Sequence, residues 1–278
     1  MKGGVLHRLS AFAETPAGGN PAGVWVGDVM PDEATMQQIA ADVGFSETAF
    51  ISPASGLNRM IRYFSPETEV PFCGHATIAG AAVLGAAGEE VTYELTTNVG
   101  IVPVTVRSID GRTEVSLRSV EPQHKLASKA IIDEALAILG WKNDELDSAI
   151  APAVAYAGAW HLVIAVAESK RLAELDYDFE RLKRMMLREN VTTLQLVWRE
   201  NDTLFHSRNP FPVGGVVEDP ATGAAAAALA GYLRDAGLIS SPISFEIRQG
   251  EKMGRPSLLK ITVPAAGGII ITGSVVEI

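Results

Sequence analysis

One segment in the first half of the chain recurs in the second half, and this repeat constrains the fold more than any other feature. When residues 69–84 are aligned with residues 218–233, seven of the sixteen pairs are identical. The matches that alanine richness cannot explain are Glu69 with Glu218, Pro71 with Pro220 and Gly74 with Gly223. Self-similarity of this kind indicates that one structural plan is used twice. We therefore expect two similar lobes, which a chain of 278 residues can accommodate.

Each copy of the repeat consists of a glycine-containing turn that runs into a segment of small residues, at 74–88 and at 223–237. Neither segment has a polar face over its first three turns, so each is expected to form a helix buried on all sides. The predicted fold class is α+β, with two pseudo-symmetric lobes, each a curled mixed sheet around a central helix. We place one lobe at residues 1–122, which the last strand at 266–278 could join, and the other at residues 123–265.

Apolar periodicity predicts further elements in both lobes. Pro31 suits the first turn of a helix over residues 31–43, and Gly44 can end it. Two more helices are expected at 128–139 and 178–189. Strands are expected at 5–12, 24–26, 45–52, 59–64, 91–96, 101–107, 113–118, 161–167, 193–199, 243–248, 258–263 and 268–277.

Charge and composition exclude several classes of function. The net charge of −10 argues against a nucleic-acid partner, because phosphate binding needs a basic patch. The single cysteine, Cys73, excludes an internal disulfide and a thiol-rich metal site. No apolar run is long enough to span a bilayer, and the first twenty residues lack a secretory signal, so we expect a cytoplasmic protein without a membrane partner.

Three polar residues stand where the repeat and the strand pattern suggest chemistry. Glu47 shares a predicted strand face with apolar residues, and a carboxyl in such surroundings suits a general acid or base, although the pattern alone favours an edge strand whose glutamate meets water. His75 lies at the start of the first buried helix, where it could act as a neutral donor or merely complete the turn. Asp219 precedes Pro220 and could be a ligand-binding residue or a helix N-cap.

The two buried helices are expected to point their N-termini toward the place where the lobes meet. Unpaired backbone N–H groups and the positive end of the helix dipole would attract a carboxylate there. A small carboxylate-bearing substrate is therefore favoured.

Five segments, read in order, resemble the signature segments of the PhzF-like (phenazine-biosynthesis) family. They are GGNPAGVWV, GFSETAFI, RYFSPETEVPFCGHATIAGAAVLG, GVVEDPATGAAAAALAGYL and RQGEKMGRPS, and together they span nearly the whole chain. The family is similar in fold to diaminopimelate epimerase, with two lobes that each wrap strands around a central helix. The resemblance also implies a homodimer.

The resemblance implies roles for individual residues. It identifies Glu47, His75 and Asp219 as catalytic, with no metal and no cofactor. It places the substrate against a further set of residues, Asn20, Ser46, Gly74, Thr222, Gly223 and Ala224. Ala224 stands where phenazine-pathway members carry a serine, so this chain lacks a hydroxyl contact with the phenazine precursor.

We predict a cofactor-independent isomerase that moves a proton within a small carboxylate-bearing metabolite. Epimerases of this fold use two cysteines, and the repeat places Thr222 opposite Cys73, where its hydroxyl is too weakly acidic for that role. One alternative is an amino-acid racemase or epimerase that uses Glu47 and Cys73. Another is a non-catalytic protein that binds a metabolite or a partner.

Overall fold

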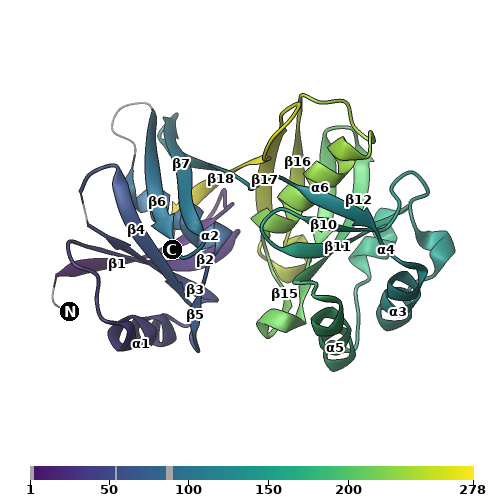
Figure 1. Ribbon diagram of the computed structural model, residues 1–278, viewed down its shortest axis with the longest axis horizontal. Coiled ribbons are helices and arrows are strands. Elements are labelled where there is room, and N and C mark those ends of the chain that lie inside the picture. The colour runs from purple at the N-terminus through teal and green to yellow at the C-terminus, as the bar shows by residue number, and fades with distance from the viewer. Residues whose placement is uncertain (1–2, 54, 86–89) are drawn as a thin grey trace. The chain divides into compact units, whose positions relative to one another are not determined.

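The computed structural model describes residues 3–53, 55–85 and 90–278. The chain forms two compact units (Figure 1). Unit 1 comprises the residues up to Arg118 together with Thr272–Ile278, and unit 2 comprises Ser119–Ile271. The C-terminal strand thus returns to the unit that contains the N-terminus.

Unit 1 is a barrel of mixed strands. Its elements are β1 (Gly4–Ala11), β2 (Asn20–Gly27), α1 (Glu33–Val43), β3 (Glu47–Ser52), β4 (Asn58–Phe64), β5 (Glu69–Val70), α2 (Gly74–Leu84), β6 (Glu90–Thr97), β7 (Gly100–Ile109), β8 (Arg112–Arg118) and most of β18 (Ile270–Glu277). The strand order is β1-β2-β3-β4-β6-β7-β8-β18, and β18 pairs back onto β1, which closes the barrel.

Helix α2 lies inside this barrel, against β1, β2, β3, β7 and β8. The predicted burial is confirmed, because every residue from His75 to Ala81 is buried. Small side chains allow this approach: a Cβ added at Gly80 would lie 2.9 Å from the Ile51 side chain of β3. Residues 86–88 of the small-residue segment lie outside the described residues.

Unit 2 is a curled sheet around α6. Its elements are β9 (Gln123–Leu126), α3 (Lys129–Leu139), β10 (Ala153–Tyr156), β11 (Trp160–Val166), α4 (Ser169–Ala173), α5 (Phe179–Glu189), β12 (Thr193–Asn201), β13 (Leu204–Arg208), β14 (Pro210–Phe211), β15 (Val216–Glu218), α6 (Gly223–Asp235), β16 (Ile243–Gln249) and β17 (Ser257–Val263). The strand order is β9-β10-β11-β12-β13-β16-β17, and α6 contacts strands at both ends of this order. Residues 225–233 of α6 are buried, as predicted.

The same connections occur in both units. In unit 1, β2 runs parallel to β3 after α1, and β4 runs parallel to β6 after α2. In unit 2, β11 runs parallel to β12 after α4 and α5, and β13 runs parallel to β16 after α6. In each unit, therefore, the repeated segment is the helical connection between the second pair of parallel strands.

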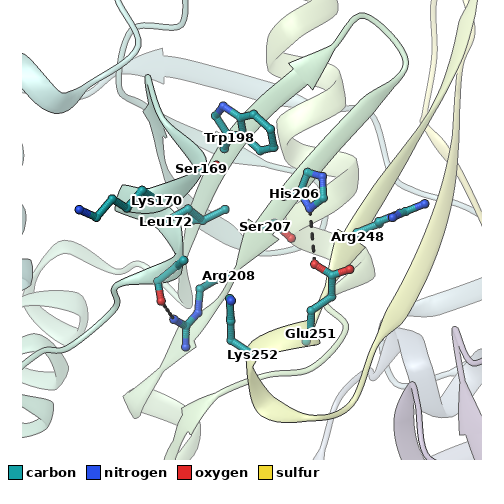
Figure 2. Close-up of a pocket in the computed structure, with 12 residues that line it drawn as sticks. Ser169, Lys170, Leu172, Trp198, His206, Ser207, Arg208, Arg248, Glu251 and Lys252 are labelled. Carbon is teal, nitrogen blue, oxygen red and sulfur yellow. Dashed lines mark hydrogen bonds and ion pairs between the residues drawn. The ribbon is translucent and has the colours of Figure 1, made fainter.

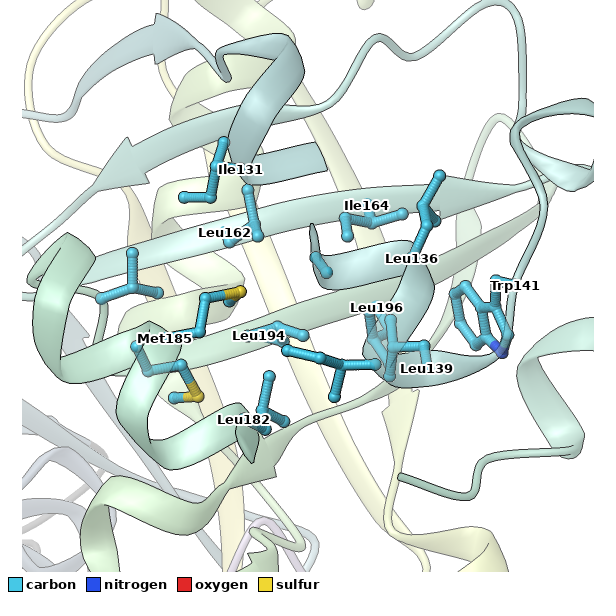
Figure 3. Close-up of a cluster of buried hydrophobic side chains, with 14 of the residues drawn as sticks. Ile131, Leu136, Leu139, Trp141, Leu162, Ile164, Leu182, Met185, Leu194 and Leu196 are labelled. Carbon is cyan, nitrogen blue, oxygen red and sulfur yellow. The ribbon is translucent and has the colours of Figure 1, made fainter. Parts of the chain in front are cut away.

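The outer face of the unit 2 sheet is covered by α3 and α5 (Figure 3). Alternate residues of β11 and β12 point toward these helices, and the others point toward α6. The buried contacts come from Ile131, Leu136 and Leu139 of α3, Leu182 and Met185 of α5, and Leu162, Ile164, Leu194 and Leu196 of the strands. The residues of this layer lie outside the repeated segments, and most of their side chains are large and apolar.

Several local expectations differ from the structure. Helix α1 begins at Glu33, because the Asp32 side chain caps it by accepting from Thr35 N at 2.9 Å, which leaves Pro31 outside the helix. Asp219 is not a helix N-cap, since α6 begins at Gly223 and Thr222 occupies the cap position.

In the part of the chain that the structure describes, no helix has both the length and the apolar character needed to cross a membrane.

Candidate active site

Glu47 and His75 meet in unit 1. Glu47 is the first residue of β3, and His75 is the second residue of α2. Oε2 of Glu47 lies 3.3 Å from Nε2 of His75. The two side chains are only 18% and 9% exposed, so this contact is largely removed from water. A partly buried carboxyl beside an imidazole can hold and release a proton.

The other contacts of His75 define the state of its ring. Asn20 Nδ2 lies 3.3 Å from His75 Nδ1, and Ser46 Oγ lies 3.4 Å from Nε2. Because the amide nitrogen can only donate, this contact fits the tautomer in which Nδ1 accepts and Nε2 carries the ring proton. His75 then donates toward the Glu47 carboxylate. The structure thus brings together four of the predicted residues, Asn20, Ser46, Glu47 and His75, within unit 1.

The start of α2 is fixed by a short buried network. Thr77 Oγ1 donates to the Cys73 carbonyl at 2.6 Å, and the Tyr63 hydroxyl lies 2.7 Å from the same Oγ1. Burial raises the pKa of Tyr63 above its ordinary value, so this hydroxyl stays neutral. The network holds the first turn of α2, and with it His75, against β4.

Glu47, Cys73 and His75 could in principle supply three ligands to a metal ion, since their ligand atoms lie within 4.8 Å of one another. The thiol, however, is closer to Nδ1 of the ring, at 3.3 Å, than to Nε2, at 3.9 Å. The carboxylate lies at Nε2. The thiol and the carboxylate thus lie nearest to different nitrogens of one imidazole.

The predicted residues of the second repeat lie together at the start of α6 in unit 2. The Thr222 hydroxyl lies 2.5 Å from Oδ2 of Asp219. Gly223 is the first residue of the helix, and Ala224 follows it in a half-buried position. Thr222 therefore directs its side chain toward Asp219.

Helices α2 and α6 differ from the other long helices in how they begin. The side chains of Asp32, Ser128 and Asp178 accept hydrogen bonds from the first turns of α1, α3 and α5. Neither Cys73 nor Thr222 caps its own helix in this way. The first backbone N–H groups of α2 and α6 are consequently not used by a cap side chain.

The repeat also identifies a structural ion pair that we did not predict. Arg62 donates two hydrogen bonds to Glu69, at 2.7 and 2.6 Å, and thereby lowers the pKa of that carboxyl. In unit 2, Arg208 donates to Glu218 at 3.0 and 2.5 Å. The matched glutamates of the repeat thus anchor the turns that precede α2 and α6. The alignment of Glu69 with Glu218 was a signal for this role, but the arginines are not aligned with each other.

A separate cavity of about 230 Å³ lies in unit 2 (Figure 2). Trp198, His206 and Arg208 line it from the sheet face that carries α3 and α5, opposite α6. Three of its cationic or titratable groups already have acidic neighbours, namely Arg208 with Glu218, Lys170 with Glu174, and His206 with Glu200 and Glu251. The cavity contains none of the predicted site residues, and acid–base chemistry is better served by the Glu47–His75 pair.

Comparison with known proteins assigns the family. The family model described as phenazine biosynthesis-like protein (PhzC-PhzF) matches residues 9–276. The chain is 29% identical to an uncharacterized isomerase of Bacillus subtilis, with 99% of this chain and 97% of that protein covered. It is 31% identical to the trans-2,3-dihydro-3-hydroxyanthranilate isomerase of Pseudomonas fluorescens, with 90% and 87% covered.

Solved structures agree on the fold. A PhzF-family phenazine biosynthesis protein of Bacillus anthracis superposes with a TM-score of 0.87 at 24% identity, over 100% of this chain and 98% of that one. A probable proline racemase of Agrobacterium radiobacter superposes with a TM-score of 0.66 at 14% identity, over 98% and 90%. With a family model matched over almost its entire length, the chain belongs to the phenazine biosynthesis-like (PhzC-PhzF) family.

Proposed function

We propose that this isomerase moves a proton from one carbon to another within a small carboxylate-bearing metabolite, with Glu47 as the group that carries the proton. The ionised carboxylate takes the proton from carbon, and the electron pair of that C–H bond enters the conjugated system of the substrate. Protonated Glu47 then returns the proton to a different carbon, so the double bond shifts. The step is balanced without an oxidant, a reductant or a second substrate.

The contact between Glu47 and His75 is the observation that carries this proposal. His75 Nε2 faces one carboxylate oxygen, Oε2, at 3.3 Å. No hydrogen bond within the described residues engages the other oxygen, which is then available to a substrate C–H bond. The contact with the imidazole orients the carboxylate and leaves its second oxygen to exchange a proton with the substrate, as a reversible acid–base group requires.

The starts of helices α2 and α6 support a carboxylate-bearing substrate. The first N–H groups of α2 and α6 are not taken by a cap side chain, and such groups bind anions and stabilise negative charge that develops during enolisation. We propose that Gly74 and Gly223 contribute such amides and that His75 and Asp219 orient the substrate. We also propose that the two units are pseudo-symmetric lobes, each of which contributes one of these helix starts.

Ala224 argues for a substrate other than that of the phenazine pathway. The resemblance places a serine hydroxyl at this position in phenazine-pathway members, and Ala224 has only a methyl group. A site that loses a hydrogen bond to substrate discriminates strongly between related molecules. We therefore propose that trans-2,3-dihydro-3-hydroxyanthranilate, named for the Pseudomonas fluorescens relative, is a poor substrate here.

The geometry disfavours a racemase that uses Glu47 and Cys73. Two bases on opposite faces of one carbon need to lie roughly 6–7 Å apart, because each reacting atom is about 3–3.5 Å from that carbon. The ligand atoms of Glu47 and Cys73 are within 4.8 Å of each other. Both groups would therefore approach the substrate from the same side.

Deuterium uptake tests the proposal. The chain is incubated in D₂O with a panel of small carboxylates, including trans-2,3-dihydro-3-hydroxyanthranilate, and label is located by NMR. We expect Glu47→Gln to lower labelling by about two to four orders of magnitude while binding changes only a few-fold. The control is Glu67→Gln, an exposed glutamate of the loop before β5. Normal labelling by Glu47→Gln would overturn the mechanism. In the wild-type chain, label confined to an alpha carbon with loss of stereochemistry would indicate a racemase. Binding of a carboxylate without any labelling would indicate a non-catalytic protein.

A further inference from the structure

The side chain of Gln249, at the end of β16, contacts the turn that carries Asp219. It is buried, with 1% of the residue exposed. Its Nε2 donates to the Asp219 carbonyl at 2.8 Å and to Thr222 Oγ1 at 3.0 Å. Its Oε1 accepts from Ser207 Oγ at 3.1 Å and from Thr222 N at 3.4 Å. Both donors and the acceptor of this amide are thus in use.

These bonds impose a direction on the Thr222 hydroxyl. Because Gln249 donates to Thr222 Oγ1, that oxygen must act as an acceptor toward Gln249. Its own proton is then directed to Asp219 Oδ2, which lies 2.5 Å away. A chain of hydrogen bonds therefore runs from the Gln249 amide through the Thr222 hydroxyl to the Asp219 carboxylate.

The backbone that follows Gln249 holds these hydrogen-bonding groups in place. Gly250 has a φ of 75°, a left-handed conformation that favours glycine. A Cβ at Gly250 would lie 2.3 Å from the Arg255 carbonyl oxygen and 2.8 Å from that of Pro220. The end of β16 is consequently packed directly against the turn that contains Asp219 and Thr222.

We propose that Gln249 is a positioning residue for the isomerase reaction, which it serves by orienting Thr222 and, through Thr222, the Asp219 carboxylate. The inference rests on the proposed role of Asp219 in the substrate site. Gln249 itself touches no reacting atom. Its effect requires an N–H donor at this position, which a carboxylate of the same shape lacks.

Two substitutions at Thr222 separate positioning from packing. Thr222→Val keeps the shape and removes the hydroxyl, whereas Thr222→Ser keeps the hydroxyl and removes a methyl group. We expect Thr222→Val and Gln249→Glu to lower kcat/KM at least tenfold on the carboxylate that the wild-type chain labels fastest. Thr222→Ser should lose less activity than Thr222→Val, since the hydroxyl is retained. A purely packing role gives the reverse order, with Thr222→Ser the poorer enzyme.

Ser207→Ala is the matched control. It removes a hydrogen bond to the same amide but leaves the bonds to Asp219 and Thr222 in place, so kcat/KM should stay within about threefold while the unfolding midpoint falls.

Asp219→Asn distinguishes the proposed role of Asp219 from the positioning role of Gln249. If Asp219→Asn is fully active, the role of Asp219 fails and the inference fails with it. If Asp219→Asn is impaired and Thr222→Val is not, the inference alone is overturned.

A second measurement needs no substrate. The side-chain amide protons of Gln249, observed by NMR, should exchange slowly with solvent in the wild-type chain. In Thr222→Val one of the two should shift and exchange faster, and in Thr222→Ser neither should. Two rapidly exchanging protons in the wild-type chain would overturn the inference independently of any activity.

Discussion

The Sγ atom of Cys73 lies 3.3 Å from Nδ1 of His75, at the ring nitrogen that Glu47 does not face. Asn20 Nδ2 lies at the same distance from this nitrogen, so the ring keeps a donor when the thiol is removed. We expect Cys73→Ala to retain turnover within about threefold, because a thiol at Nδ1 is not needed for the proton transfer that we propose for Glu47. Deuterium uptake by the variant and by Cys73→Ser measures this. A loss of a hundredfold with the fold intact would restore a thiol-based mechanism.

His161 makes stability depend on pH. Full burial lowers the pKa of His161 from 6.5 to about 3. The unfolded chain takes up a proton below about pH 6.5 and the folded chain does not, so stability is complete above that pH and is lost as pH falls toward 3. The slope is at most about 1.4 kcal/mol per pH unit.

His161→Gln tests this dependence, since the amide can still face Thr193 Oγ1, which lies 2.7 Å from His161 Nδ1. Unfolding free energies from urea titrations between pH 7 and pH 4 should fall less steeply for the variant than for the wild-type chain. Identical pH profiles would show that His161 takes up its proton in the folded state.

The Arg208–Glu218 pair should contribute strongly to stability. The side chains are 14% and 4% exposed. Arg208→Met leaves the carboxylate without its partner, and breaking a buried pair costs about 3–5 kcal/mol. The double variant Arg208→Met/Glu218→Met should recover much of that loss. Lys129→Ala, which breaks an exposed pair with Asp133, is the control and should change the unfolding midpoint very little.

Gly231 and Gly74 should respond differently to alanine. A Cβ at Gly231 in α6 would lie 2.2 Å from the Pro122 ring, and overpacking of this kind costs about 1–3 kcal/mol. A Cβ at Gly74 would have no heavy atom within 4 Å. Denaturant midpoints should therefore fall for Gly231→Ala and hold for Gly74→Ala. Equal midpoints would show that the start of β9 moves to accommodate the methyl group.

The repeat and the small-residue segments predicted the part of the fold that positions the site. The buried helices α2 and α6 follow from sequences in which no polar face competes for water. The strands β9 and β10 were not predicted, because four-residue strands carry too few alternations to be distinguished from loops. Asp219 was interpreted as a possible cap because Pro220 suits a first helical turn, but the helix starts only at Gly223.

The part of the candidate site that lies within unit 1 could be predicted from the sequence. Glu47 and His75 were named from the strand pattern, the helix start and the family resemblance, and the structure places them in contact. Gln249 was not named, although it lies within a quoted family segment, because a lone glutamine has no pattern that distinguishes a buried amide from an exposed one. The homodimer and the cytoplasmic location stay predictions.

The position of β18 between β8 and β1 has a consequence for how the chain is made. The ribosome releases residues 272–278 only after the roughly 150 residues of unit 2, which takes on the order of ten seconds at common synthesis rates. During that interval the unit 1 barrel has two unpaired strand edges, at β1 and β8, and such edges can pair with another nascent chain. A fragment that stops before β18 should therefore aggregate, whereas fusing residues 270–278 ahead of β1 through a flexible linker should let unit 1 close while the rest of the chain is still being translated.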